Sequence, residues 1–161
     1  MTISEYNSCV DDHSDGVYRF ILKNLKETEI AHDIVQESFM KLWIKRKGVT
    51  ATKGKSYIFT TAYHTMIDHI RKNKRNVSIE NAENIQDESH NSYNELKDIL
   101  NAAVEKLPEI QRSVILLRDY EGYSYEEIGE ITNLNESQVK VYIYRARLFL
   151  KKFIGSPELV I

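Results

Sequence analysis

The 161-residue chain contains little proline, glycine or cysteine, and it has no long apolar run. Two prolines and six glycines are too few for a loop-rich or all-β design. No segment approaches the roughly 18 apolar residues of a spanning helix, so we expect a protein that is not membrane-inserted. Residues 1–15 are polar and acidic, which is not typical of a signal peptide. The single Cys9 cannot form an internal disulfide, which favours a reducing, cytoplasmic location.

Charge is distributed unevenly along a chain whose formal net charge is only -2. Residues 1–75 carry 13 Lys and Arg against 9 Asp and Glu, whereas residues 76–98 carry one against six. Residues 138–153 hold five basic residues and no acidic one. Basic faces on a near-neutral chain are compatible with DNA binding restricted to those faces, although many solvated helix faces are also basic.

Apolar residues recur at helical spacing in residues 1–75 and predict three or four helices. The first helix is expected to end near Lys26, and Thr28 is a plausible N-cap of the second. Gly48 suits the C′ position after the second helix. A third helix is expected over residues 56–74. The predicted core positions of the second and third helices are Ile30, Ile34, Val35, Phe39, Leu42, Ile58 or Phe59, Ala62, Met66, Ile67 and Ile70.

Residues 76–94 are rich in Asn, Glu and Ser and contain few large apolar groups. Such a segment cannot bury enough surface to offset the entropy lost on ordering, so we interpret it as a flexible acidic linker. Helical periodicity resumes after it, and no strand pattern competes anywhere. The fold class predicted is therefore all-α, with two small helical domains at residues 1–75 and 95–161.

The second domain begins with an amphipathic helix that is expected to stop at Pro108, with Pro108 at the N1 position of the next helix. That next helix is expected to end at Gly122. The inward positions predicted for the first of these helices are Leu96, Ile99, Leu100, Ala103, Val104 and Leu107.

Two capping boxes frame a short turn in residues 124–138. Ser124 with Glu127 opens a short helix, and Asn135 with Gln138 opens a long final one. Asn133 and Leu134 fall in the turn, and Gly129 permits a close approach of the two helices. This pattern predicts a helix-turn-helix, because the final helix separates a core face from a basic outer face. The core face predicted is Val139, Ile143, Ala146, Leu150 and Phe153. The alternative is a charged surface helix of an ordinary bundle.

Two other surfaces are candidates in the first domain. Asp33, Gln36, Glu37 and Lys41 lie on the polar side of the second helix, near Trp43, which suits protein docking, although the pattern alone favours a solvated face. The third helix mixes aromatic and basic residues, which suits unstacked bases and phosphates of a single strand. The alternative is that the tyrosines of this helix pack in the core.

These residues resemble a known family. The stretch from Asp33 to Trp43 resembles the polymerase-binding motif of the extracytoplasmic-function (ECF) sigma factors of bacterial RNA polymerase. Leu107-Pro108 and the following residues resemble the opening of the family's fourth conserved region. Residues 122–147 resemble its helix-turn-helix. The resemblance covers about residues 16–75 and 96–154, in the family's order.

The resemblance implies a sigma factor that binds core RNA polymerase and directs promoter-specific initiation. Asp33, Gln36, Glu37, Phe39, Lys41 and Trp43 would dock on the clamp coiled coil of the largest polymerase subunit. The third helix and the loop at 48–55 would melt and hold the minus-ten element, with a flipped base in the loop; the contacts implied are Lys55, Tyr57, Tyr63, His64, Arg71 and Lys72. The last helix would read the minus-thirty-five element with Asn135, Ser137, Gln138, Lys140, Val141, Tyr144 and Arg145. A cognate anti-sigma factor is also implied.

The chain departs from the common family pattern at three places. Tyr57 stands where the family often has Trp, His64 stands where it usually has Asn, and Ser137-Gln138 replaces small residues and Thr. The third departure suggests a distinct minus-thirty-five preference.

Three other classes of protein fit the sequence less well. A free-standing helix-turn-helix repressor or activator leaves the first domain unexplained, and a protein-only adaptor leaves the last helix unexplained. For a metalloenzyme, His64 and Asp68 have the spacing of metal ligands and His69 is adjacent in sequence, but a third ligand is missing. We therefore expect no enzyme activity, no metal, no cofactor and no small-molecule ligand.

Overall fold

The computed structural model describes residues 1–76 and 92–155, and within these ranges the chain is helical without a β-strand. The predicted all-α class is therefore confirmed. Most of the predicted linker, residues 77–91, lies outside the described residues. The elements follow in the order α1 (Ile3–Leu25), α2 (Thr28–Lys45), the 3-10 turns η1 (Arg46–Gly48) and η2 (Ala51–Lys53), α3 (Gly54–Asn76), α4 (Ser92–Lys106), α5 (Glu109–Ile115), the π-helical turn η3 (Leu116–Tyr120), α6 (Tyr125–Thr132) and α7 (Glu136–Ile154).

Helix α1 begins at Ile3, within the polar segment of residues 1–15. Thr2 caps it, because its hydroxyl accepts a hydrogen bond from the Glu5 amide at 3.1 Å while the Glu5 carboxylate accepts one from the Thr2 amide at 2.9 Å. A capping box satisfies two otherwise unpaired amides of a helix start. Residues 3–15 are therefore helical although most of them are polar.

The ends of α2 differ from the predicted ones. Helix α1 ends as expected, with Lys26 in the left-handed region at φ 62°. Glu27, not Thr28, then occupies the N-cap of α2, and it makes no side-chain cap bond. Gly48 is not a left-handed C′ residue, because Arg46 keeps a right-handed helical backbone and α2 tightens directly into η1.

Helices α1, α2 and α3 form one three-helix unit, here called the N-terminal module. Most of the core positions predicted for it are buried, but Ile30, Val35 and Ile70 are only partly so. The largest fully buried side chains of this module are Phe20, Ile21, Leu42, Ile58, Phe59 and Met66.

Helices α4 to α7 form the C-terminal module. Pro108 is the N-cap of α5 and not its first residue. Gly122, which follows α5 and η3, has φ 74°. Leu96 and Ile99 are 46% and 45% exposed, and Phe153 is 38% exposed, so these three predicted core positions are wrong. Leu96 and Ile99 lie in the first half of α4 and Phe153 lies at the end of α7, where helical periodicity indicates a face but not whether a neighbouring helix covers it.

The helix-turn-helix forms from α6, the turn at residues 133–135 and α7. Both predicted capping boxes are present, with Glu127 N bonded to Ser124 Oγ at 3.1 Å and Gln138 N bonded to Asn135 Oδ1 at 2.8 Å. Asn133 adopts the left-handed conformation at φ 59°. A Cβ at Gly129 would lie 2.6 Å from the Leu134 carbonyl oxygen, so glycine lets the turn fold back tightly onto α6.

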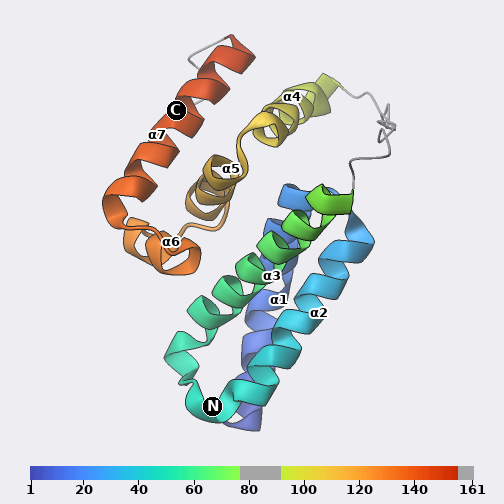
Figure 1. The fold of residues 1–161 in the computed structure, drawn as a ribbon, viewed down its shortest axis with the longest axis vertical. Coiled ribbons are helices and arrows are strands. Elements are labelled where there is room, and N and C mark those ends of the chain that lie inside the picture. Colours follow the sequence, from blue (N-terminus) through green and yellow to red (C-terminus); the bar gives the residue numbers. More distant parts are fainter. Residues whose placement is uncertain (77–91, 156–161) are drawn as a thin grey trace.

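The two modules pack against each other. Figure 1 shows the C-terminal module alongside the N-terminal three-helix unit, and α6 contacts α3 while α5 contacts α1. This contact is carried by side chains from residues far apart in the sequence, among them Arg19 with Glu121 and Asn24 with Arg112.

Candidate nucleic-acid interface

The outer face of α7 carries the seven residues predicted to read the minus-thirty-five element, and the structure leaves all of them exposed. Two of these residues also build the start of the helix, since the Gln138 side chain accepts a hydrogen bond from the Asn135 amide at 3.0 Å. The Gln138 carboxamide N–H groups stay available for an outside acceptor. Val141 and Tyr144 are 45% and 68% exposed, so their apolar groups are accessible on this face.

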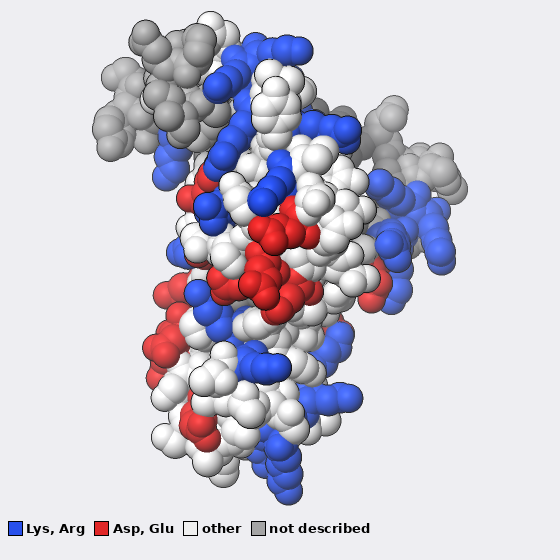
Figure 2. All heavy atoms as spheres, turned by 90° about the vertical axis from the view of Figure 1, so that its left-hand side faces the viewer, with Lys and Arg blue, Asp and Glu red and all other residues white. Residues whose placement is uncertain are grey.

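The basic side chains of α7 differ in their partners. Arg147 donates to the Asp119 carboxylate at 2.8 Å, and Lys140 lies 3.4 Å from the Glu136 carboxylate. Arg145 makes no ion pair with a described residue, although it projects from the same helix. Figure 2 shows acidic side chains clustered at mid-height, where α6 lies, with basic side chains above and below them. Positive charge is thus confined to parts of this face.

The six residues predicted to bind the minus-ten strand lie on α3 but are not equally accessible. His64, Arg71 and Lys72 are exposed and Tyr57 is half-buried. Tyr63 is only 5% exposed, and burial together with the nearby Glu109 carboxylate raises the pKa of its hydroxyl to about 12. The Lys55 ammonium lies over the Tyr123 ring, 4.5 Å from its centroid. Tyr63 and Lys55 therefore both face the C-terminal module in this structure.

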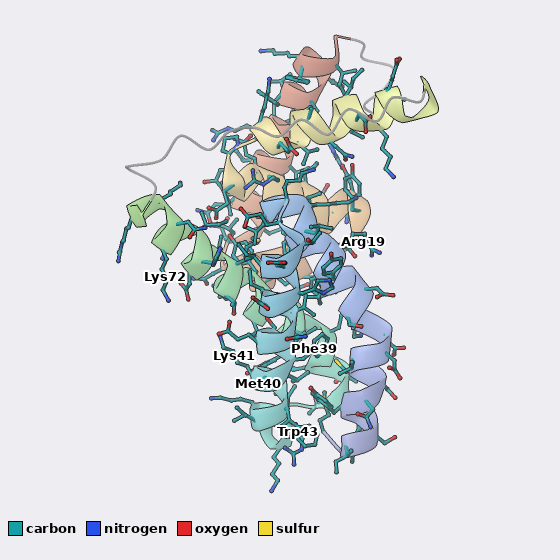
Figure 3. The ribbon with its side chains drawn as sticks, turned by 90° about the vertical axis from the view of Figure 1, so that its right-hand side faces the viewer. Arg19, Phe39, Met40, Lys41, Trp43 and Lys72 are labelled. Atoms are coloured by element: carbon teal, nitrogen blue, oxygen red, sulfur yellow. The ribbon has the colours of Figure 1, made fainter. Side chains whose placement is uncertain are left out.

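The six residues predicted to dock on polymerase separate onto two sides of α2. Gln36, Phe39 and Trp43 line an apolar groove between α1 and α2, whose wall also includes Met40. Asp33, Glu37 and Lys41 line a polar groove between α2 and α3 together with Asp68, His69 and Lys72. Figure 3 shows Phe39 and Trp43 on the part of α2 that faces α1.

Trp43 is held in place by residues that the sequence did not single out. The Tyr6 ring meets it edge-on with centroids 4.9 Å apart, and the Tyr6 hydroxyl donates to the Phe39 carbonyl at 3.0 Å. The Arg46 guanidinium covers the indole at 3.8 Å and donates to the Trp43 carbonyl. Met40 and Ile44 are 61% and 70% exposed on the same helix. Helical spacing predicts only that such residues lie outside the core. It does not predict that they form an apolar surface.

Potential metal ligands do not form a cluster in the part of the chain that the structure describes. Within residues 1–76 and 92–155 no group of three or more His, Cys, Asp or Glu side chains is placed to hold a metal ion. His69 shares a 3.2 Å hydrogen bond with Asn73 on the next turn of α3.

Family models and curated proteins match nearly the whole chain. The model for sigma-70 region 2 matches residues 9–76, and the model for sigma-70 region 4 matches residues 97–150. The chain is 32% identical over 161 residues to the ECF RNA polymerase sigma factor SigM of Bacillus subtilis, covering 94% of each protein. It belongs to the ECF sigma factors. It is also 34% identical to the RNA polymerase sigma factor SigV of the same organism, over 94% of this chain and 92% of that protein.

The fold agrees with this membership. A solved complex of the sigma factor RpoE with the anti-sigma factor NepR from Bartonella quintana contains a chain that superposes with a TM-score of 0.74 over 95% of this sigma factor, at 23% identity. As an ECF sigma factor, the protein acts with RNA polymerase on promoter DNA to direct transcription initiation. None of its described helices is both long and apolar enough to span a bilayer.

Proposed function

We propose that α7 reads the minus-thirty-five element as duplex, with contacts from Asn135, Ser137, Gln138, Lys140, Val141, Tyr144 and Arg145. The observation that carries this proposal is that all seven side chains are exposed on one capped helix of a helix-turn-helix. A capped helix start directs its amide dipole toward phosphate, while Arg and Gln donate to base edges. The exposed Val141 and the ring of Tyr144 suit apolar contact with thymine methyl groups.

For the minus-ten element we propose that α3 and residues 48–55, which include η2 and the first residues of α3, bind the melted strand. Lys55, Tyr57, Tyr63, His64, Arg71 and Lys72 combine cations with aromatic rings along one helix, which is the combination that binds single-stranded DNA. His64 is exposed and offers a ring that can stack and hydrogen-bond.

Docking on the polymerase clamp coiled coil is proposed for α2. The apolar groove of Gln36, Phe39, Met40 and Trp43 supports it, because exposed apolar and aromatic groups in one patch are typical of protein interfaces. Asp33, Glu37 and Lys41 on the adjacent polar groove would supply the charged rim of the contact.

The division of labour along the chain follows from these assignments. Residues 1–75 would act as region 2, residues 95–161 as region 4, and residues 76–94 as an acidic linker, although α3 includes residue 76 and α4 already includes residues 92–94. The protein would have no catalytic activity of its own, and it would act in the cytoplasm because its polymerase partner does. Bartonella quintana RpoE was solved with an anti-sigma factor, and we extend this to a cognate anti-sigma partner here, which would cover the docking surfaces.

Run-off transcription from a pool of genomic promoter fragments tests the proposal. Core RNA polymerase is assayed with wild-type protein and with variants altered in α7, α3 or α2. Alterations in α7 should change which transcripts appear, whereas alterations in α2 should lower all transcripts together. Binding of the protein to duplex DNA without any polymerase-dependent transcript would instead indicate a conventional helix-turn-helix regulator.

A further inference from the structure

Helix α7 contains a single acidic residue, and this residue lies where the helix begins. Glu136 is the first residue of α7, and no Asp or Glu follows it up to Ile154. Its side chain is 58% exposed, and its Oε1 atom lies 3.4 Å from the Nζ atom of Lys140 on the next turn. A recognition helix contacts base edges with its N-terminal residues. A carboxylate therefore stands at the end of α7 that is proposed to enter the major groove.

The start of α7 does not depend on the Glu136 side chain. The capping box uses Asn135 and Gln138, whose side chains each accept a hydrogen bond from the other's backbone amide. An acid in the first turn stabilises a helix through the helix dipole, but any helix start gains from this effect. Close to DNA a carboxylate is also repelled by the phosphates, which weakens binding to every sequence alike. A hydrogen bond from a base to Glu136 would offset this repulsion.

The Glu136–Lys140 pair matches the major-groove edge of one base pair. A G·C pair presents the O6 and N7 acceptors of guanine beside the N4 amino donor of cytosine. Because O6 and N4 are hydrogen-bonded to each other, they lie about 2.9 Å apart. The Glu136 acceptor and the Lys140 donor are 3.4 Å apart. The two side chains therefore offer one acceptor and one donor at nearly the spacing that a G·C pair requires.

An A·T pair fits these two side chains less well, although it also presents a donor beside an acceptor. A carboxylate that accepts from adenine N6 lies next to the N7 lone pair, which repels it. An ammonium at thymine O4 meets one acceptor and the neighbouring methyl group, whereas at guanine it meets two acceptors. The pattern of charge therefore favours G·C.

The Tyr125 ring also contacts the Lys140 ammonium. Tyr125 is the first residue of α6, and its ring centroid lies 5.6 Å from Lys140 Nζ and 4.4 Å from Arg118 Cζ. Arg118 in turn donates to the Tyr123 carbonyl at 2.9 Å. Lysine has a long flexible stem, and a cation–π contact within about 6 Å favours the arrangements that keep the ammonium over the ring. Lys140 is thus directed by two neighbours before DNA binds.

We propose that Glu136 is a base-reading residue, and that the Glu136–Lys140 pair reads one G·C base pair of the minus-thirty-five element. Lys140 donates to guanine O6 and N7, Glu136 accepts from the cytosine N4 amine, and Tyr125 is a positioning residue for Lys140. The proposal rests on the assignment of α7 to the minus-thirty-five element. It extends that assignment to an acidic residue that the basic pattern of the helix did not indicate.

The test measures base preference at each position of the minus-thirty-five element. A promoter found in the pooled run-off assay is made as a set in which every base pair of the element is replaced in turn. Core RNA polymerase with full-length wild-type or variant protein transcribes this set in competition. Wild type should disfavour replacement of one G·C pair by about tenfold, as is typical of a specific base contact. Glu136→Gln and Lys140→Ala should each lose most of this discrimination, both at the same base pair.

Three further variants separate base reading from effects on the helix. Glu126→Gln removes an exposed acid from the first turn of α6 and should leave every base preference unchanged. Tyr125→Leu removes the ring and should weaken discrimination at the shared base pair, whereas Tyr125→Phe keeps the ring and should retain it. Because Glu136 is exposed, Glu136→Gln should keep the wild-type fold, which circular dichroism checks.

The outcomes distinguish this inference from the assignment on which it rests. If Lys140→Ala loses discrimination at a base pair where Glu136→Gln keeps it, Glu136 does not read that pair and the inference is overturned. A uniform change across the promoter set in Glu136→Gln also overturns it, since this indicates only repulsion of phosphate, and so does a shared pair that is A·T. If neither Lys140→Ala nor Arg145→Ala alters any base preference, the assignment of α7 to the minus-thirty-five element is itself wrong.

Discussion

Asn24 and Arg112, 88 positions apart, meet at the junction between the two modules, where the Arg112 Nε donates to the Asn24 Oδ1 at 2.9 Å. The same oxygen lies 3.4 Å from the buried Ser113 hydroxyl, and the Asn24 amide donates to the Phe20 carbonyl at 3.0 Å. Burial of its guanidinium lowers the pKa of Arg112. The carboxamide therefore joins both modules through one buried side chain.

Replacing Asn24 by alanine should destabilise the folded chain. The change leaves Ser113 and the half-buried Arg112 without this acceptor, which costs about 1–3 kcal/mol. For a chain of this length each kcal/mol lowers the melting temperature by about 2–4 °C, so thermal unfolding followed by circular dichroism should show the loss. Asn7→Ala, at an exposed position on the same helix, is the matched control and should leave the melting temperature unchanged. Equal melting temperatures for all three proteins would contradict a stabilising role for Asn24.

The turn of the helix-turn-helix makes a second prediction through Gly129. A methyl group there would lie 2.6 Å from the Leu134 carbonyl oxygen, so Gly129→Ala must push the turn away from α6. Overpacking of this kind costs about 1–3 kcal/mol. Gly48→Ala is the control, because its Cβ meets no atom within 4 Å and its backbone does not require glycine. Urea unfolding should therefore separate the two variants, and similar midpoints would show that the turn accommodates the methyl group.

The turn and caps of the helix-turn-helix were predictable because their determinants are local. Ser124 with Glu127 and Asn135 with Gln138 are each three residues apart, and a capping box needs nothing more. Leu96 and Phe153 were assigned to the core wrongly, since periodicity indicates a face but not how far the neighbouring helix extends along it. The contact of Arg19 with Glu121 joins residues 102 positions apart and follows no periodic pattern, so it required the three-dimensional structure.

Alkaline pH should weaken the fold through Tyr63. Its pKa is raised from 10.0 to about 12, first by burial and then by Glu109. The unfolded chain releases this proton near pH 10 and the folded chain near pH 12, so the free energy of unfolding falls as pH rises between these values, by at most about 1.4 kcal/mol per pH unit. Urea unfolding from pH 9 to 11.5 should show a shallower decline for Tyr63→Phe than for wild type. Part of the decline should persist, because burial also raises the pKa of Tyr123. Identical slopes would refute the assignment to Tyr63.

Two arginines of α7 should differ in their effect on promoter choice. Arg145 makes no ion pair with a described residue, and its replacement by alanine should cost about 1–3 kcal/mol at the promoter and relax specificity at one position. Arg147 is bonded to Asp119, and breaking an exposed pair of this kind costs about 0–1 kcal/mol of stability. Arg147→Ala should thus leave the set of transcripts unaltered in the pooled run-off assay. If Arg147→Ala changed that set as much as Arg145→Ala, the proposed reading face of α7 would have to be redrawn.

The apolar groove beside α2 makes the last prediction, because it separates a docking surface from ordinary surface apolar groups. Met40 is 61% exposed within the groove, and Ile3 is 59% exposed on α1 outside it. If polymerase covers the groove, Met40→Ala removes apolar area that is buried on binding and should cost about 1 kcal/mol, which is roughly a fivefold loss of affinity. Ile3→Ala removes a similarly exposed group and should have no effect in the same competition assay for core RNA polymerase. Since neither side chain belongs to the core, both variants should keep wild-type unfolding midpoints. An equal loss for both variants would indicate that affinity depends on general surface hydrophobicity, and the assignment of the Phe39–Met40–Trp43 groove as the polymerase contact would be wrong.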